Sequence, residues 1–294
     1  MNLSCDKICP TAKLIALMRA IADIPYCREL AELMDAKRTA DEIFGEKSLR
    51  IAAAMAPIME LRYHSISALV EKCGIKNILE IAAGFSPRGL AMTKRNPTIH
   101  YVESDLRMVL EEKKELVHQI MTLGQDKPEN LCFCAADALD RWQLFEVAKN
   151  FSAGPIVIVT EGLLLYLSRE EKEIMTSNIG HLLKKFGGVW ITTDVSLKKR
   201  FGSLNEANDI KAGLEKIAQL TGRGFADNAF ADETEANKFF AGLGFETKAL
   251  NQISLVGENN LKSLKLNLSP DCRRVLSPLL QTAKVWVLES KKVK

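Results

Sequence analysis

The sequence predicts an α/β protein with a doubly wound, mostly parallel sheet of seven strands, the last of them antiparallel, and a helical N-terminal cap. Three observations favour this class. Apolar runs of strand length recur along the chain, five of them alternate with segments of helical periodicity, and glycine or a capping residue stands at the joins. A chain of 294 residues that is 47% hydrophobic can bury a full core without disulfides or metal.

The N-terminal part is predicted to be entirely helical. Apolar residues recur three and four positions apart from residue 11 to about residue 72; they are Leu14, Leu17, Met18, Leu30, Leu33, Met34, Ile51, Met55, Ile58 and Met59. We therefore divide the chain into a helical cap, residues 1–72, and a sheet domain, residues 73–294.

The period changes at the first predicted strand, Ile75–Ile81, which is short, apolar and followed by a turn that contains glycine. Ser86 is predicted to cap the next helix, with Pro87 at its first position.

Four more strand and helix units follow the first. The strands are Ile99–Glu103, Leu131–Ala136, Pro155–Thr160 and Val189–Thr193, and the helices are Leu106–Leu123 closed by Gly124, Asp140–Lys149, and Ser168–Phe186 with a capping box of Ser168 and Glu171.

The pattern loosens after the fifth strand. We predict a helix over Ser203–Leu220, a loop over Gly222–Phe230 and a helix over Thr234–Leu243. Two late strands, Phe245–Leu250 and Lys284–Leu288, form a hairpin-like pair separated by an excursion. Residues 195–231 are expected to form an insertion that covers the ends of the strands and selects the substrate.

Composition excludes several classes of protein. Forty Lys plus Arg against 37 Asp plus Glu, with the signs mixed along the chain, gives no basic stripe for nucleic acid. The longest strongly apolar run, Gly154–Val159, is too short for a membrane span, and the charged N-terminus does not resemble a signal peptide. The seven cysteines lack metal-site spacing, which favours reduced thiols, no metal and a cytoplasmic location.

The turn after the first strand reads Glu80-Ile-Ala-Ala-Gly-Phe-Ser-Pro-Arg88. Ala82 and Pro87 stand where a dinucleotide fingerprint needs glycine, so a nicotinamide cofactor is disfavoured. What remains is Gly84, a helix N-terminus that favours an anionic group, and the acidic Glu80. These features suit a ligand with a carboxylate and an ammonium, such as S-adenosylmethionine. The alternative is an ordinary turn without a ligand.

Acidic side chains also follow the next two strands. Glu103 and Asp105 stand about 20 residues beyond the glycine turn, the spacing at which a carboxylate binds ribose hydroxyls, and either could serve. Asp137 follows the third strand, where it could accept the adenine amine while Ala138 leaves room for the ring. The alternative for each acid is a solvated loop charge.

Taken with Tyr101-Val-Glu-Ser-Asp-Leu106, Ala136-Asp137 and Glu161-Gly-Leu-Leu-Leu-Tyr-Leu167, this turn resembles the leucine carboxyl methyltransferase family. That family is a class I S-adenosylmethionine-dependent group with a Rossmann-like sheet, and it includes protein phosphatase methyltransferases and bacterial relatives described as polyketide O-methyltransferases. The resemblance covers about Arg62 to Asp194. Ala82 departs from the first glycine of the family's usual Gly-Ala-Gly turn.

The resemblance implies roles for matching positions. They are Gly84 under the methionine part, Asp105 on the ribose, Asp137 and Ala138 around the adenine, Glu161 facing the methionine amino group or the substrate, and Arg62 pairing with the cofactor carboxylate.

Methyl transfer is an in-line displacement that depends mainly on alignment and exclusion of water. A carboxylate acceptor is already ionised, whereas a hydroxyl acceptor would need a base, for which His64, Tyr166 and Glu161 are the candidates. The motif typical of nitrogen methylation, Asn/Asp-Pro-Pro-Tyr/Phe, does not follow the fourth strand. O-methylation is therefore favoured, with Glu161 and Tyr166 as the catalytic candidates.

The leading hypothesis is an S-adenosylmethionine-dependent O-methyltransferase that acts on a carboxylate or hydroxyl of a small molecule, with no nucleic-acid or membrane partner. The alternatives are a protein C-terminal carboxyl methyltransferase and a cofactor-binding domain without turnover. Lys198, Lys199, Arg200 and Arg223 in the insertion suggest a solvated surface or, alternatively, a cation that receives an acidic substrate. The sequence does not predict the acceptor's identity or the oligomeric state.

Overall fold

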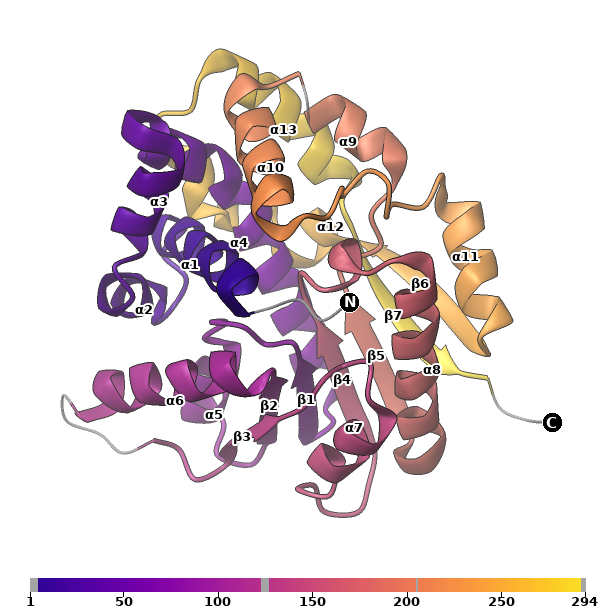
Figure 1. Ribbon diagram of the computed structural model, residues 1–294. Coiled ribbons are helices and arrows are strands. Elements are labelled where there is room, and N and C mark those ends of the chain that lie inside the picture. The colour runs from indigo at the N-terminus through magenta and orange to yellow at the C-terminus, as the bar shows by residue number, and fades with distance from the viewer. Residues whose placement is uncertain (1–4, 123–126, 205, 292–294) are drawn as a thin grey trace.

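A sheet of seven strands forms the centre of the computed structural model, which describes residues 5–122, 127–204 and 206–291 (Figure 1). The strands are β1 Asn77–Ile81, β2 His100–Asp105, β3 Leu131–Ala135, β4 Ile156–Thr160, β5 Gly188–Thr192, β6 Phe245–Asn251 and β7 Lys284–Ser290. Their order is β3-β2-β1-β4-β5-β7-β6. The order reverses between β1 and β4, which is where ligands bind in doubly wound sheets.

The strand pairing confirms the predicted topology. β1 pairs in parallel with β2 and β4, and β4 pairs in parallel with β5. Both β1 and β4 are buried along their whole length, as expected of central parallel strands covered on both faces. β7 lies antiparallel between β5 and β6, so the last strand is antiparallel as predicted.

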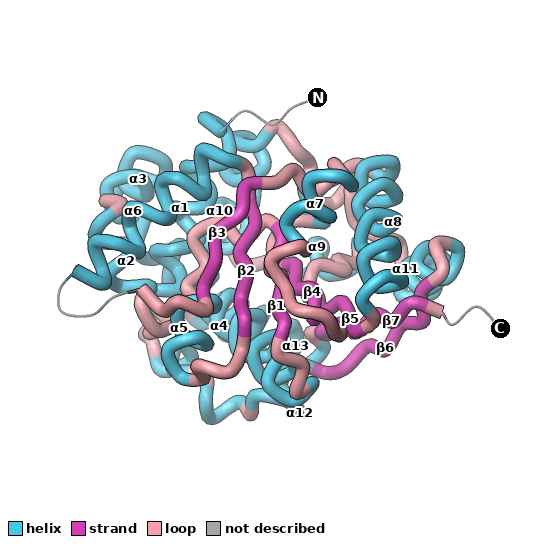
Figure 2. Tube along the Cα trace, turned by 90° about the horizontal axis from the view of Figure 1, so that it is seen from below, coloured by secondary structure: helices cyan, strands magenta, loops and turns pink. Residues whose placement is uncertain are grey.

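Helices cover both faces of the sheet (Figure 2). One face carries α7 Arg141–Ala148, α8 Arg169–Phe186 and α11 Glu233–Gly242, and the other carries α4 Ser48–Cys73, α5 Arg88–Arg95, α6 Arg107–Thr122 and α12 Gln252–Val256. The capping box of Ser168 and Glu171 at the start of α8 is present as predicted.

The N-terminal part is helical, as predicted. Its helices are α1 Cys5–Ile21, α2 Cys27–Leu33, α3 Ala36–Phe44, η1 Gly45–Lys47 and α4. They share a hydrophobic core with α9 Lys198–Leu204, α10 Asn208–Thr221 and α13 Pro270–Thr282. In Figure 1 the arrowheads of β4 and β5 point toward these helices. The cap and the insertion thus lie over the carboxyl ends of the strands, while the domain boundary at residue 73 stays a prediction.

Two local predictions were wrong, and a third segment, the excursion before β7, was predicted without its elements. The helix after β1 begins at Arg88, and its N-cap is Pro87 instead of the predicted Ser86. Ser86 is buried in the preceding turn. The helix predicted over 203–220 begins only at Asn208, as α10, with the buried Ala207 at its N-cap, and Ser203 and Leu204 belong to the end of α9. The excursion before β7 holds α12, α13 and two short helices, η3 Glu258–Asn260 and η4 Lys262–Lys265.

Two further predictions concern the end of α6 and the cysteines. Gly124, predicted to close α6, lies outside the described residues, as do the side chains of Cys5 and Cys9. The five described cysteines are free thiols, and no group of metal-ligating side chains occurs among the described residues. Within the same ranges, the helices are all too short or too polar to cross a bilayer.

Candidate active site

The turn after β1 is held against the end of β2. The backbone N–H of Gly84 donates to Asp105 Oδ2 at 2.7 Å, and the N–H of Leu106 donates to Asp105 Oδ1 at 2.7 Å. Burial raises the pKa of Asp105, although these two backbone hydrogen bonds act to lower it. Asp105 therefore fixes the shape of the turn at the switch point of the sheet.

The turn is open on the side of Gly84. This residue has φ +49°, in the left-handed region that favours glycine, and no atom lies within 4 Å of the place where a Cβ would stand. Ala82 has φ +53° and is one of the few residues other than glycine with positive φ. The glycine that is usual at position 82 in the resembling family is thus replaced at a position where the backbone favours glycine.

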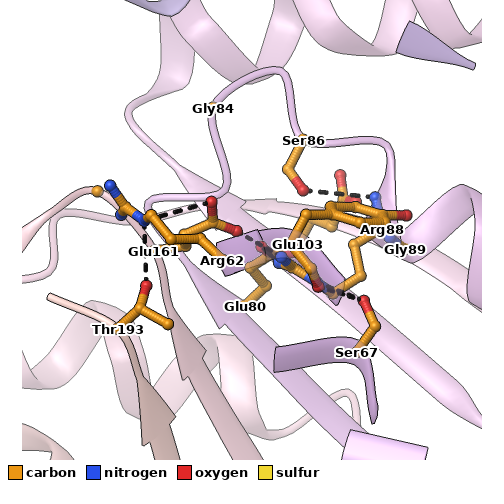
Figure 3. A network of polar contacts seen from close by, with 12 residues as sticks. Arg62, Ser67, Glu80, Gly84, Ser86, Arg88, Gly89, Glu103, Glu161 and Thr193 are labelled. Atoms are coloured by element: carbon orange, nitrogen blue, oxygen red, sulfur yellow. Dashed lines mark hydrogen bonds and ion pairs between the residues drawn. The ribbon is translucent and has the colours of Figure 1, made fainter. Parts of the chain in front are cut away.

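A cluster of arginines and carboxylates fills the space between this turn and β4 (Figure 3). Glu161, which follows β4, accepts hydrogen bonds from Arg19 Nη2 at 2.7 Å and from Arg88 Nη2, and Arg62 Nε lies 3.8 Å from its Oε1. Only 2% of the Glu161 side chain is exposed. Burial alone would raise the pKa of Glu161, but the attraction of Arg19, Arg88 and Arg62 outweighs burial and holds this pKa well below its usual range.

Arg88 links this cluster to the core of the sheet. Its Nη1 donates to Glu80, its Nε donates to Ser67 Oγ at 3.2 Å, and its guanidinium lies 4.8 Å from the centre of the Tyr63 ring. The other oxygen of Glu80 accepts a hydrogen bond from Tyr101 at 2.7 Å. Arg88 and Glu80 are both fully buried. Glu80 was predicted to attract the cofactor's ammonium, yet both of its oxygens are engaged by protein groups.

The two carboxylates of β2 have different surroundings. Glu103 is buried beneath the start of α5, where it pairs with Lys113 and accepts a hydrogen bond from Gly89 N at 3.2 Å. Burial, the largest influence, raises the pKa of Glu103 to about 7. Asp105, by contrast, lies at the turn. The structure thus separates the two candidates that spacing alone left equal, and it gives Glu103 partners unlike those expected of a ribose ligand.

Asp137 and Ala138 lie half-exposed beside Asp105. The N–H of Ala136 donates to the backbone oxygen of Asp105 at 2.9 Å, which joins the two strand ends. Asp137 Oδ1 accepts a hydrogen bond from the N–H of Leu139 at 2.9 Å, so its carboxylate shapes the loop before α7. The structure therefore brings Gly84, Asp105 and Asp137 to neighbouring positions on one edge of the sheet.

Comparison with known proteins identifies the family. The sequence pattern of the leucine carboxyl methyltransferase family matches residues 12–180, which is more than half of the chain. The chain belongs to the leucine carboxyl methyltransferase family. The family uses S-adenosylmethionine, and its reaction class is methyl transfer.

A curated relative is the leucine carboxyl methyltransferase 1 of Eremothecium gossypii, which is 26% identical over 156 residues. The match covers 46% of this chain and 47% of the relative, so the chain spans about half the length of the curated relative it matches.

Solved structures show the same fold. A methyltransferase structure from Thermobifida fusca has a TM-score of 0.54 at 15% identity, covering 95% of this chain and 94% of that one. A protein from Streptomyces avermitilis has a TM-score of 0.54 at 12% identity, covering 95% and 97%. Human N-acetylserotonin methyltransferase, solved in complex with S-adenosylmethionine, has a TM-score of 0.50 at 11% identity, covering 94% and 70%.

In this member of the family, two arginines and one aspartate of the site were not assigned a role from the sequence. Arg19 and Arg88 both bind Glu161, and Asp194 binds Arg62 Nη2 at 2.8 Å. Asp194 also accepts hydrogen bonds from the N–H groups of Gly162, Leu163 and Leu164. Its position directly after β5 was the signal that could have found it. Arg19 gave a weaker signal, a charge in the first amphipathic segment.

A cavity of about 90 Å³ lies beside the cluster, between the cap and the insertion. Its lining is mainly apolar, with Arg62, Tyr166, Thr193, Ser196 and Arg200 as polar exceptions; the apolar residues include Ile15, Met55, Ile58, Leu165, Phe201, Ile217 and Phe225. Arg62 Nε donates to Thr193 Oγ1 at 3.1 Å, so this arginine reaches both the cluster and the cavity.

Tyr166 stands at the end of η2 Leu164–Tyr166 and lines the same cavity. Its ring packs edge-on against Phe225, with centroids 5.2 Å apart. Burial, more than any nearby charge, raises the pKa of Tyr166. Its hydroxyl is therefore suited to donate a hydrogen bond rather than to act as a base at neutral pH.

Proposed function

We propose that the chain transfers the methyl group of S-adenosylmethionine to an oxygen atom of a small, largely apolar acceptor. The observation that carries the proposal is the mainly apolar cavity beside the cluster of Arg62 and Glu161. The side chains that line this cavity come from the cap, the insertion and the ends of β4 and β5, so an acceptor there would be enclosed on several sides.

The residues at the carboxyl ends of β1, β2 and β3 suit the cofactor. Gly84 leaves open space at the turn, and Asp105 and Asp137 place carboxylates beyond it. Arg19, Arg62 and Arg88 stand among Glu80, Glu161 and Asp194, so groups of both charges are present where an amino-acid tail would lie. We propose that Asp105 holds the ribose, Asp137 and Ala138 the adenine, Glu161 the ammonium and Arg62 the carboxylate.

When bound, S-adenosylmethionine supplies an electrophilic methyl group on a sulfonium. The protein's part is to hold the acceptor oxygen in line and to exclude water, for which the apolar lining of the cavity is suited. A carboxylate acceptor needs no base. For a hydroxyl acceptor, the raised pKa of Tyr166 and the lowered pKa of Glu161 make both groups poor bases, so we propose that they orient the acceptor instead.

Protein carboxyl methylation is the second candidate, because a curated relative is named a leucine carboxyl methyltransferase. A small molecule is favoured over a chain terminus because the cavity, of about 90 Å³, is small and lined mainly by apolar side chains. We also propose a cytoplasmic location, supported by the free thiols of the described cysteines.

Two measurements test the proposal. Calorimetry with S-adenosylhomocysteine should show binding; its absence would contradict the cofactor site and favour a domain without turnover. Labelled S-adenosylmethionine should then be incubated with a panel of small apolar acids and alcohols and, in parallel, with a peptide that ends in leucine. Label on the small molecules alone supports the proposal, and label on the peptide alone supports protein methylation.

A further inference from the structure

Arg200 differs from the other cations of the insertion. It stands in α9 and lines the cavity, whereas its neighbours Lys198 and Lys199 are exposed. The fourth cation, Arg223, pairs with Glu171 at 3.0 Å. The sequence could not say which of these cations receives an acidic group, and the structure singles out Arg200.

Among the residues that the structure describes, the guanidinium of Arg200 lacks a partner. Over residues 5–122, 127–204 and 206–291, it is within ion-pair distance of no carboxylate, and no oxygen accepts a hydrogen bond from it. The charge that acts on it most is Arg62, which has the same sign and is already paired with Asp194. Burial, followed by repulsion from Arg62, lowers the pKa of Arg200 to about 10.

An unpaired charge in an apolar setting destabilises the folded protein, because the lost hydration is not replaced. Phe201 and Leu204 of the same short helix contribute to the apolar lining of the cavity, so packing does not require a cation at position 200. An anion from outside the protein would supply the missing partner. A guanidinium matches the two oxygens of a carboxylate in a planar, bidentate arrangement.

We propose that Arg200 is the specificity-determining residue of the acceptor site and binds a carboxylate on an otherwise apolar acceptor. This inference rests on the proposed function and narrows its acceptor to an ionised apolar acid. One free guanidinium in a small apolar cavity matches a group with a single charge. A phosphate ester, which carries nearly two charges at neutral pH, would need further free cations.

The test compares matched acids and amides on the protein saturated with S-adenosylhomocysteine. Calorimetry with hexanoate and hexanamide, and with phenylacetate and phenylacetamide, should show at least one acid binding tenfold or more tightly than its amide. In Arg200→Gln this preference should disappear. The acid should bind more weakly, and the affinity for the amide should not change. Lys199→Gln, an exposed neighbour with the same change of charge, should keep the preference.

Equal affinity for acid and amide, absence of binding by both acids, or a preference that survives in Arg200→Gln would overturn the inference. A separate readout uses the free protein. Arg200→Met should unfold at the same or a higher temperature than the wild type, because it removes an unpaired, partly buried charge from an apolar setting. A clearly lower temperature would show a structural role instead.

The two proposals fail in different ways. Binding of hexanoate or phenylacetate needs no turnover, so it tests Arg200 alone. Formation of a methylated product from S-adenosylmethionine tests the proposed function. Acid-selective binding that depends on Arg200, with no methylated product from any small molecule, would contradict O-methylation while leaving the carboxylate site established.

Discussion

Ala82 and Gly84 both adopt positive φ in the turn of the proposed cofactor site. A side chain in the left-handed region costs about 1–2 kcal/mol, whereas glycine adopts it freely. The strain at Ala82 persists because the neighbouring residues are held in place: the N–H of Ala83 donates to Ser104 O at 3.0 Å and Gly84 is bonded to Asp105.

Replacing Ala82 with glycine should stabilise the protein. The relief of strain exceeds the entropy that glycine gains in the unfolded chain, and the expected net gain is about 0.5 kcal/mol in the free energy of unfolding. Urea denaturation measures it. The matched control is Ala83→Gly, a buried neighbour outside the left-handed region, which should lose about 1 kcal/mol. If Ala82→Gly also destabilises the protein, the strained turn is refuted.

Asp105 is the residue on which the ribose assignment depends. Asp105→Ala removes a carboxylate that can accept charge-assisted hydrogen bonds, so the affinity for S-adenosylhomocysteine should fall more than tenfold, or about 1.5–3 kcal/mol. Calorimetry gives the value. Glu111→Ala, an exposed acid in α6, removes the same charge nearby and should leave the affinity within about twofold, since surface charges are screened. An unchanged affinity in Asp105→Ala would remove the assignment.

Part of the site could be predicted at this scale. Strand ends bring carboxylates to one edge of a parallel sheet, which is why the sequence pattern predicted Asp105 and Asp137, whereas Glu161 was predicted from the family resemblance. The choice between Glu103 and Asp105 was open because β2 runs two residues further than its apolar run indicates. Gly89 makes room for the Glu103 carboxylate under α5, since a Cβ there would meet Glu103 Oε1 at 2.4 Å.

At the scale of elements, one buried carboxylate joins α4 to the excursion before β7. Glu60, fully buried in α4, accepts hydrogen bonds from Lys262 N at 2.8 Å, from Ser263 N at 2.9 Å and from the Ser263 hydroxyl. Glu60 therefore accepts hydrogen bonds from the first two backbone N–H groups of η4. The first N–H groups of a helix have no acceptor within the helix itself.

Truncation of Glu60 should destabilise the fold. In Glu60→Ala the donors of Lys262 and Ser263 lose their acceptor inside the protein, and we expect a loss of about 3 kcal/mol in the free energy of unfolding by urea. The control is Glu71→Ala in the same helix. Glu71 is half-exposed and pairs with Arg95 on the surface, so its loss should cost less than about 1 kcal/mol. Equal effects in the two variants would show that η4 is held by packing alone.

Elements could be predicted wherever local periodicity and caps specify them. The five parallel strands, the capping box of α8 and the loop over residues 222–230 all carry such signals. The excursion before β7 does not, because its short helices depend on distant partners such as Glu60, 202 residues from Lys262. The break between α9 and α10 likewise follows from the burial of Ala207 among residues of other helices.

At the scale of the whole molecule, Glu161 joins parts of the chain that lie far apart in sequence. Arg19 belongs to α1, Arg62 to α4 and Arg88 to α5, and Arg19 and Glu161 are 142 residues apart. A cluster that joins the cap to the sheet depends on the complete fold, so Arg19 could not be assigned from the sequence, whereas the family resemblance implied roles for Arg62 and Glu161. The same cluster makes the stability of the molecule depend on pH.

The direction of this dependence follows from the lowered pKa of Glu161. The unfolded chain takes up a proton at the ordinary value of 4.5, while the folded protein resists protonation. The stabilisation is therefore complete well above pH 4.5 and is lost as the pH falls below it, with a slope of up to about 1.4 kcal/mol per pH unit. The difference in unfolding free energy between the wild type and Glu161→Gln should shrink steadily from pH 5 to pH 3.5 in urea titrations.

Glu103 provides a control of opposite sign. Burial raises its pKa to about 7, so the folded protein binds a proton that the unfolded chain releases near 4.5, and this group lowers stability as the pH rises between those values. The wild type should therefore lose stability relative to Glu103→Gln from pH 5 to pH 7, where the Glu161 comparison stays flat. If the two differences in unfolding free energy changed with pH in the same way, neither carboxylate would have the pKa shift described above. Opposite slopes in separate pH ranges would tie Glu161 to its arginines and Glu103 to its burial under α5.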